Sequence, residues 1–263
     1  MSDVGFIRIQ GRNLEYRLLQ GADAEASPLL LLHEGLGSIS LWRDFPEKLA
    51  AATGRSVLVW SRYGYGRSDP LSERRPVDYL HAEALGALPE LLEKVGIARP
   101  LLVGHSDGAT IALLHAALAE RPLEGVVAIA PHVFVEEIAL EGIRRAGAAF
   151  RRGQLAERLA RHHRDAASTF AGWHDTWLDP EFRQWSIEDC LPKITAPLLL
   201  IQGEEDEYGT LAQLDAIEAR VSGPVQRLVL EACGHMPHRE REAESLAAIA
   251  AFACELRQRP EEP

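Results

Sequence analysis

A serine flanked by glycines is the first feature of the sequence that points to chemistry. The segment Gly-His-Ser-Asp-Gly at residues 104–108 matches the pattern Gly-x-Ser-x-Gly, after an apolar run at 101–103 and before a helix-like segment. Such a strand-to-helix turn lifts the serine oxygen out of a sheet, and the small flanking residues let the backbone pack closely. The following helix points its positive end at the site. We therefore expect Ser106 to act as a nucleophile; the alternative is an ordinary tight turn.

The two neighbours of Ser106 carry reactive side chains as well. Asp107 as a nucleophile would need a glycine two places to either side, but His105 and Ala109 stand there. This register excludes an aspartate nucleophile, so we expect only the backbone N–H of Asp107 to contribute. His105 should turn its side chain away from the site and serve in packing or hydrogen bonding.

A serine hydroxyl needs a base, and ten histidines compete for that role. His235 lies in a short loop, residues 233–237, between the last expected strand and the final helix, where it could fold back over Ser106. His238 is the alternative, but Pro237 indicates a helix start that would make it a surface residue. Three further histidines show no metal-ligand spacing, so no metal site is expected: His162, His163 and His174.

The base in turn needs a carboxylate that holds its tautomer. Four acids crowd the loop at 204–207, directly after an apolar run and Gly203. We expect Asp206 to be the partner of His235, because its place after the glycine and its short side chain suit the role. Glu205 is the alternative, and the remaining acids fit a solvated charge run.

The chain order Ser, Asp, His, each after a strand, resembles the α/β-hydrolase superfamily, in particular its capped esterase, lactonase and C–C hydrolase branch. The segment at 33–38 is similar to the family's His-Gly-x-x-Gly-Ser loop. The resemblance implies an oxyanion hole formed by the N–H groups of Gly35 and Asp107. Glu34 replaces the usual small residue; we expect it to bind a polar substrate group or assist proton transfer, or else to satisfy nearby donors.

A second segment also resembles the family. Residues 61–68 are similar to its Asp-x-x-Gly-x-Gly-x-Ser stretch, with Ser61 in place of the aspartate, and we interpret them as scaffold. A third glycine at the offset of a dinucleotide site is absent and no helix is expected to begin there. No nicotinamide, flavin or other cofactor is therefore expected.

The elements that must position these residues alternate between strands and helices, which predicts an α/β fold with a doubly wound, mostly parallel sheet. An antiparallel hairpin at 6–20 should extend the sheet edge. The expected strands lie at 29–32, 56–60, 101–103, 126–129, 198–201 and 226–230. The expected helices lie at 44–52, 79–95, 107–120, 210–221 and 240–257.

The strand–helix rhythm fails between residues 132 and 191, which we interpret as an inserted helical cap on a core formed by 1–131 and 192–263. Helical patterns occur at 133–152, 154–164 and 175–190. Three tryptophans of this segment are expected to roof the site and contact substrate, although ordinary packing accounts for any one of them: Trp173, Trp177 and Trp185.

Composition narrows the function classes. The net charge of -11 argues against a nucleic-acid partner. Three widely spaced cysteines indicate neither a disulfide framework nor a metal-binding pair, which fits a reducing cytoplasm. We see no secretory signal and no apolar run long enough to span a bilayer, and expect a soluble protein without a membrane partner. The sequence does not determine the oligomeric state, so a homo-oligomer stays an open alternative.

These features together predict a cytoplasmic enzyme that cleaves a small carboxylic ester or lactone through an acyl-enzyme intermediate. Two alternatives stay open at this point. One is a C–C bond hydrolase acting on a diketone-type ring-cleavage product, and the other is a non-catalytic protein that binds a small ligand. The sequence does not identify the substrate, because one fold supports many chemistries.

Overall fold

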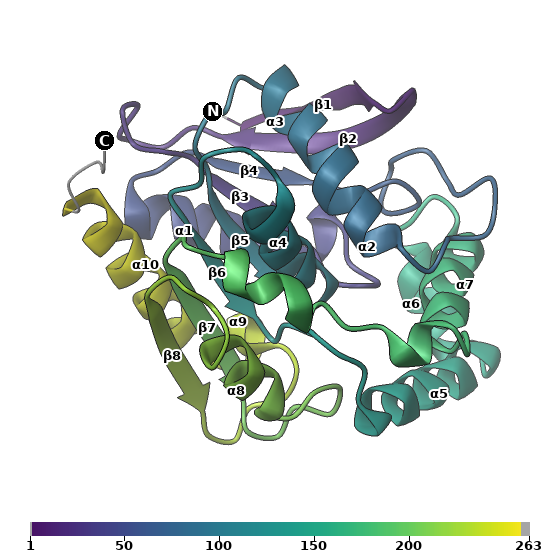
Figure 1. The fold of residues 1–263 in the computed structure, drawn as a ribbon. Coiled ribbons are helices and arrows are strands. Elements are labelled where there is room, and N and C mark those ends of the chain that lie inside the picture. Colours follow the sequence, from purple (N-terminus) through teal and green to yellow (C-terminus); the bar gives the residue numbers. More distant parts are fainter. Residues whose placement is uncertain (1, 259–263) are drawn as a thin grey trace.

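The computed structural model describes residues 2–258, which form one eight-stranded sheet with helices on both faces (Figure 1). The strand order is β1-β2-β4-β3-β5-β6-β7-β8. The strands β1 and β2 form the expected antiparallel edge hairpin, β2 pairs antiparallel with β4, and all later pairs are parallel. The bounds are β1 Ser2–Ile9, β2 Arg12–Leu19, β3 Leu29–Leu32, β4 Val57–Trp60, β5 Leu101–His105, β6 Gly125–Ile129, β7 Leu198–Gly203 and β8 Val225–Leu230. The predicted fold class is confirmed.

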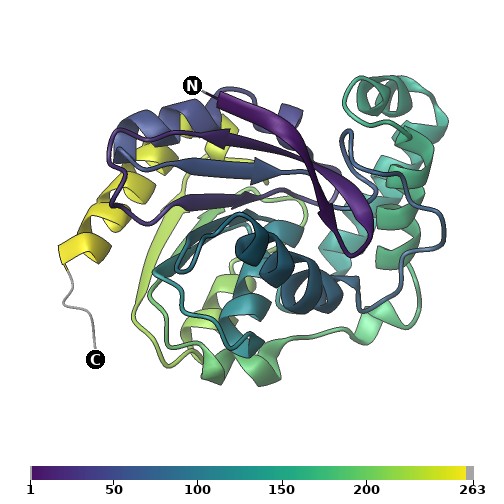
Figure 2. The same cartoon turned by 90° about the horizontal axis from the view of Figure 1, so that it is seen from above.

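Each central strand buries both of its faces, which is why its sequence is apolar throughout rather than alternating. In β3, Leu30 and Leu32 belong to one core cluster and Leu29 and Leu31 to the other. The second cluster lies under α1, Phe45–Thr53, and α10, Glu242–Gln258, which pack side by side (Figure 2). The opposite face carries α2 Tyr79–Ala82, η2 Glu83–Ala87, α3 Leu88–Lys94, α4 Asp107–Leu118 and α8 Ala212–Glu218.

Two helices differ from the expected ones in their backbone geometry. The helix expected at 79–95 is interrupted by η2, a π-helical segment in which each backbone bond spans one residue more than in an α-helix. The helix expected at 240–257 begins two residues later as α10, and the separate short helix α9, Pro237–Glu240, precedes it. Side-chain periodicity does not show the π-helical segment, whereas Pro237 does indicate the helix start at α9.

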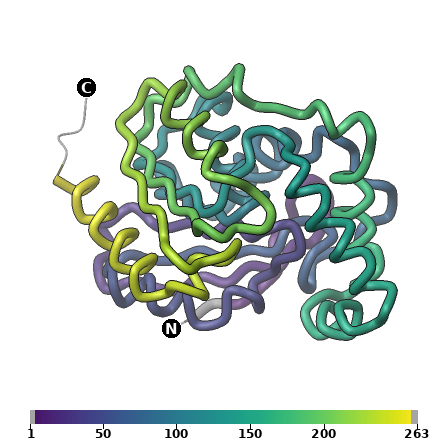
Figure 3. Tube along the Cα trace, turned by 90° about the horizontal axis from the view of Figure 1, so that it is seen from below, coloured from purple at the N-terminus to yellow at the C-terminus, as the bar shows by residue number. Residues whose placement is uncertain are grey.

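A helical insert, residues 130–197, separates β6 from β7, and its three α-helices lie at the side of the molecule opposite α10 (Figure 3). It contains α5 Glu137–Arg151, α6 Gln154–Ala160, α7 Ala166–Trp177, η3 Phe182–Gln184 and η4 Glu188–Lys193. The helix expected at 175–190 is wrong. Instead α7 begins after Asp165, whose side chain accepts the Ser168 N–H at 2.9 Å, and the 3-10 segments η3 and η4 follow.

The side chain of His163 ties this insert to the core. It accepts a hydrogen bond from the Gly66 N–H at 2.9 Å and donates one to the Leu36 carbonyl at 3.0 Å. Thr169 adds a bond to the Gly64 carbonyl at 2.6 Å. The insert is therefore fixed to the loops that follow β3 and β4. Within residues 2–258, no helix is long and apolar enough to cross a membrane.

Candidate active site

Ser106 sits at the sharp turn between β5 and α4. Its backbone has a φ of 53° and a ψ of -117°, a region that a residue with a side chain seldom adopts. A Cβ added at Gly104 would overlap the Gly108 carbonyl, and one added at Gly108 would overlap the Leu32 carbonyl. The glycines on either side of the serine are thus required by close backbone packing, and the Ser106 N–H donates to the Ile129 carbonyl at 2.9 Å.

His235 lies in the loop between β8 and α9 and bridges the other two predicted residues. Its Nε2 is 3.0 Å from the Ser106 Oγ, and its Nδ1 is 2.8 and 2.9 Å from the two carboxylate oxygens of Asp206. The Nδ1–H therefore donates to Asp206, which leaves Nε2 free to accept the serine proton. The structure brings Ser106, His235 and Asp206 together in one hydrogen-bonded line.

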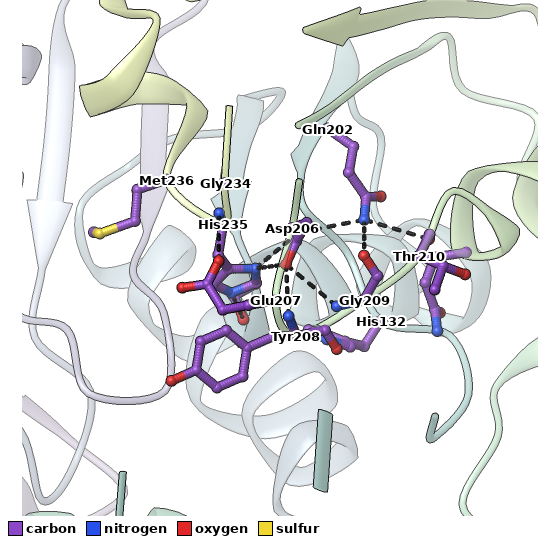
Figure 4. Close-up of polar contacts among 12 residues, drawn as sticks. His132, Gln202, Asp206, Glu207, Tyr208, Gly209, Thr210, Gly234, His235 and Met236 are labelled. Atoms are coloured by element: carbon purple, nitrogen blue, oxygen red, sulfur yellow. Dashed lines mark hydrogen bonds and ion pairs between the residues drawn. The ribbon is translucent and has the colours of Figure 1, made fainter. Parts of the chain in front are cut away.

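The carboxylate of Asp206 is held by its own loop (Figure 4). Its Oδ1 accepts the N–H groups of Tyr208 at 2.8 Å and Gly209 at 3.2 Å, and its Oδ2 accepts the side-chain amide of Gln202 at 3.3 Å. Glu205, the alternative to Asp206, is exposed to solvent and makes no hydrogen bond to His235 within residues 2–258. Of the four acids in the loop, Asp206 therefore faces the imidazole ring.

The electrostatic surroundings favour a charged His235. Burial opposes a positive charge on the ring, but the carboxylates of Asp206, Glu207 and Glu34 outweigh it and raise the pKa of His235 above its ordinary value. Burial also opposes ionisation of Asp206, yet the neighbouring His235 and the N–H of Tyr208 lower the pKa of that carboxyl. This arrangement would stabilise an imidazolium at His235.

His105 and His238 form a buried group behind His235. The His105 Nε2–H donates to the His235 carbonyl at 2.8 Å, which matches the hydrogen-bonding role expected for it. His238 was expected at the surface, and this is wrong. Pro237 does begin a helix, but the first turn faces inward, and His238 packs with ring centroids 4.9 Å from Trp42 and 4.7 Å from His105.

Glu34 lies at the wall of the cavity that contains Ser106. Its Oε2 is 3.5 Å from the His105 Nδ1, and a Cβ at Gly37 would overlap its carboxylate. Burial opposes its ionisation, but His105 and the more distant His33 and His238 hold the pKa of Glu34 well below its ordinary value. The geometry places this carboxylate among histidines on the cavity side of the nucleophile, so both roles expected for Glu34 stay predictions.

The two residues expected to form the oxyanion hole flank the nucleophile. Gly35 lies on the same cavity wall as Ser106, and a Cβ there would overlap the indole of Trp173. Asp107 is the first residue of α4, and its carboxylate turns away from the cavity to accept the Tyr79 hydroxyl at 2.6 Å. Because the Asp107 carboxylate is hydrogen-bonded to Tyr79, the backbone N–H is the group of Asp107 that lies beside Ser106.

The cavity has a volume of about 650 Å³ and lies between the insert and the loops that carry the three hydrogen-bonded residues. Trp173 and Trp177 line it, but Trp185 does not. The Trp185 ring instead stacks on Phe182, with centroids 5.2 Å apart and planes 11° apart, behind Trp177. Two of the three tryptophans expected at the site are therefore at its wall.

Sequence reasoning missed two aromatic neighbours of His235. The Tyr208 ring centroid is 4.8 Å from that of His235, and the His132 ring centroid is 5.8 Å away. The His132 Nε2–H donates to the Tyr208 carbonyl at 3.0 Å. His132 follows the end of β6, where loops of a parallel sheet form its binding edge, so its position carried a signal. Tyr208 carried none. Residues 2–258 contain no cluster of three or more His, Cys, Asp or Glu suited to a metal ion.

Known proteins of several kinds are similar to this chain. Proline iminopeptidase of Lactobacillus delbrueckii subsp. bulgaricus is 29% identical over 111 residues, which cover 42% of this chain but only 37% of that protein. The human serine hydrolase BPHL is 26% identical over 238 residues, covering 86% of this chain and 78% of that protein. The solved structure of VinJ has a TM-score of 0.74 and 24% identity, and the match covers 97% of this chain and 99% of that one.

A family model gives the broadest match. It describes the alpha/beta hydrolase family and spans residues 29–249, from β3 to within α10, so it includes Ser106, Asp206 and His235. The match covers well over half of the chain. This protein belongs to the alpha/beta hydrolase family.

Proposed function

We propose that the protein is a serine hydrolase that cleaves a small carboxylic ester or lactone through an acyl-enzyme. The observation that carries the proposal is the imidazole of His235, which lies 3.0 Å from the Ser106 Oγ and 2.8 Å from Asp206 beside a cavity of about 650 Å³. A cavity of this size suits a small molecule rather than a folded protein. The name of the human relative, a serine hydrolase, supports the same reaction type.

In the proposed first step, the Ser106 Oγ attacks the acyl carbon while its proton passes to the His235 Nε2. The imidazolium is stabilised by Asp206, and the N–H groups of Gly35 and Asp107 would bind the oxygen that becomes negative. His235 then gives its proton to the departing alcohol, and an acyl-serine ester stays behind.

In the second step, His235 takes a proton from water, and the resulting hydroxide attacks the acyl-serine. The collapse of that intermediate returns the proton to Ser106 and releases the carboxylic acid. A lactone follows the same course, except that the alcohol and the acid leave as one hydroxy acid. We propose that residues 132–191 act as a cap on the core of 1–131 and 192–263 and shield the acyl-enzyme.

A fluorophosphonate probe tests the nucleophile directly, because it reacts with an activated serine. We expect intact-mass and peptide mapping to show one adduct at Ser106, and Ser106→Ala to abolish both labelling and the hydrolysis of 4-nitrophenyl acetate. Ser186→Ala, which removes an exposed serine of the insert, is the matched control. A panel of aryl esters, lactones and proline 4-nitroanilide then compares ester with amide cleavage. Labelling of a residue other than Ser106, or none in folded protein, contradicts the proposal.

A further inference from the structure

Arginines gather at the cavity although the chain as a whole is acidic. The sequence contains 28 Lys and Arg against 39 Asp and Glu. The residues that line the cavity nevertheless include four arginines and only two acids, Glu34 and Glu207. Three arginines come from the insert, where they lie in α5, directly after α5 and in α6, and the fourth comes from α9: Arg145, Arg152, Arg158 and Arg239. Overall composition therefore does not explain their concentration here.

The two acids do not neutralise these arginines. Glu34 lies against His105, and Glu207 accepts the His235 N–H at 3.2 Å. Within residues 2–258, the side chains of Arg152 and Arg158 make no hydrogen bond or ion pair, although their backbones take part in helical hydrogen bonds. Arg145 reaches only its own helix neighbour Glu141, at 4.0 Å. The guanidinium groups of Arg152 and Arg158 thus keep all their donors free.

The electrostatic potential between the insert and α9 is therefore positive, as the effects of these arginines on nearby pKa values show. Burial lowers the pKa of Arg239, and Arg43 and Arg158 lower it further, while Glu34 compensates in part. Burial lowers the pKa of His162 as well, and Arg161, Arg43 and Arg158 add to that effect. Like charges that repel one another without a protein partner indicate a place where an anion would be bound favourably.

We propose that the substrate carries an anionic group, which Arg152, Arg158 and Arg239 bind while the acyl carbon lies at Ser106. The inference rests on the proposed function. Guanidinium forks match the two oxygens of a carboxylate or a phosphate monoester, so the shared chemistry is a planar or tetrahedral oxyanion. The residues that line the cavity also include the apolar side chains of Ile143, Leu155 and Trp177, which would hold the carbon skeleton.

A neighbouring arginine, Arg151, is a matched control that tests whether the arginines at the cavity act only through their general positive charge. Arg151 precedes Arg152, is likewise exposed, and its side chain makes no hydrogen bond or ion pair among residues 2–258, but it does not line the cavity. If the arginines act only by their general charge, Arg151→Gln and Arg152→Gln should have equal effects. If Arg152 binds the substrate, only its substitution should change the preference among substrates.

The experiment compares three phenyl acetates that carry a different para substituent: the anionic 4-acetoxybenzoate and 4-acetoxyphenyl phosphate, and the neutral methyl 4-acetoxybenzoate. A second pair of esters tests a charge on the acyl group instead of the alcohol group. In this pair, 4-nitrophenyl hydrogen glutarate carries a carboxylate and 4-nitrophenyl pentanoate is its neutral counterpart. We expect one anionic ester to exceed its neutral counterpart in kcat/KM. The ratio should fall in Arg152→Gln but not in Arg151→Gln, and it should fall about tenfold in Arg152→Gln/Arg158→Gln, chiefly through KM, since each exposed pair contributes modestly. Whether the carboxylate or the phosphate shows the larger ratio identifies the anion.

Failure of this inference differs from failure of the proposed function. Hydrolysis that depends on Ser106 but has the same charge preference in wild type, the double variant and Arg151→Gln overturns the anion site alone. If no ester is cleaved, calorimetry with glutarate, 4-hydroxybenzoate and phenyl phosphate on the Ser106→Ala protein still tests the site. Binding that weakens about tenfold in the double arginine variant supports it, whereas no binding of any of these anions overturns it.

Discussion

At the scale of single residues, the surroundings of His235 determine how the site responds to pH. Three carboxylates face the buried ring and raise its pKa above the ordinary value: Asp206, Glu207 and Glu34. These carboxylates stabilise the imidazolium form of His235. Because a base must be neutral to accept a proton, a higher pH is then needed to give the neutral imidazole. The loop acid Glu207 contributes to this balance without touching Ser106.

We predict that kcat/KM rises with pH through a midpoint above about 6.5, the ordinary value for histidine. Glu207→Gln should shift this midpoint to lower pH by roughly 0.5 unit, because it removes a nearby negative charge and leaves an oxygen to accept the His235 N–H. The measurement is the pH profile of kcat/KM for a neutral aryl ester. Glu205→Gln, an exposed neighbour, is the control, and an equal shift in both variants would contradict the role of Glu207.

The three hydrogen-bonded residues of the candidate site could be predicted from the sequence because each has a local signature. Ser106 stands in a glycine motif, and Asp206 and His235 follow apolar runs in a fixed order. The supporting residues have no such signature. Tyr208 reaches the His235 ring only through tertiary packing, and His238 is buried because the first turn of α9 packs on Trp42 and Phe45. A helix start can be recognised locally, but the face it buries cannot.

At the scale of elements, the turn between β5 and α4 depends on backbone contact rather than on side chains. The residue Gly108 lies against the Leu32 carbonyl at the end of β3, so β3, β5 and α4 meet where Ser106 is held at its unusual φ. Any side chain at this point must separate the helix from the sheet. The strain of the nucleophile is thereby maintained by the packing of three elements.

We predict that Gly108→Ala lowers the free energy of unfolding by about 2–3 kcal/mol, the upper part of the usual range for an overpacked site, because the added Cβ would meet backbone atoms. Urea denaturation measures the change, and fluorophosphonate labelling of the remaining folded protein reports the position of Ser106. Gly86→Ala is the matched control within the helical run η2, because a Cβ there would meet only the flexible end of Gln10. Unchanged stability in Gly108→Ala would show that α4 can move away from β3 at little cost.

The aromatic side chains of the insert give a second prediction at this scale. Trp173 packs on Gly35 at the cavity wall, so Trp173→Ala should open space for a longer acyl chain. We expect the ratio of kcat/KM for 4-nitrophenyl octanoate to that for 4-nitrophenyl acetate to rise roughly tenfold, because burying about two further methylene groups of the acyl chain gives a free energy of this size. Trp185→Ala is the control, since Trp185 lies behind the wall. Equal profiles in both variants would show that Trp173 does not limit chain length.

The elements themselves were predictable to different degrees. The strands could be recognised because an apolar run buried on both faces has a clear composition, as in Leu29–Leu32. In the insert, helices are short and partly 3-10, and their bounds depend on caps such as Asp165 rather than on periodicity. The helix expected at 175–190 failed for this reason.

At the scale of the whole molecule, burial of histidine is a general property of the chain. Seven of the ten histidines have a lowered pKa, with burial as the main cause in each case, and only His235 has a raised one. Burial lowers the pKa of His163 to about 4. Five of the seven histidines have less than a tenth of their surface exposed to solvent: His33, His115, His132, His163 and His238. These side chains hold the core, the insert and α9 together as neutral groups.

These five histidines predict that the fold loses stability in mild acid. Their folded-state pKa values lie below the unfolded value of about 6.5, so as the pH falls the unfolded chain takes up protons that the folded chain does not. Their contribution is fully present above about pH 6.5 and is lost as the pH falls toward their folded values, while the raised pKa of His235 opposes the loss only weakly. Each can contribute up to about 1.4 kcal/mol between about pH 7.5 and about pH 5.5. We therefore expect urea denaturation to show a loss on the order of 4 kcal/mol over that interval, accompanied by proton uptake on unfolding at about pH 5.5. Equal unfolding free energies at the two pH values, or imidazole NMR signals that mostly titrate near the ordinary value in the folded protein, would show that these rings accept protons without opening the structure.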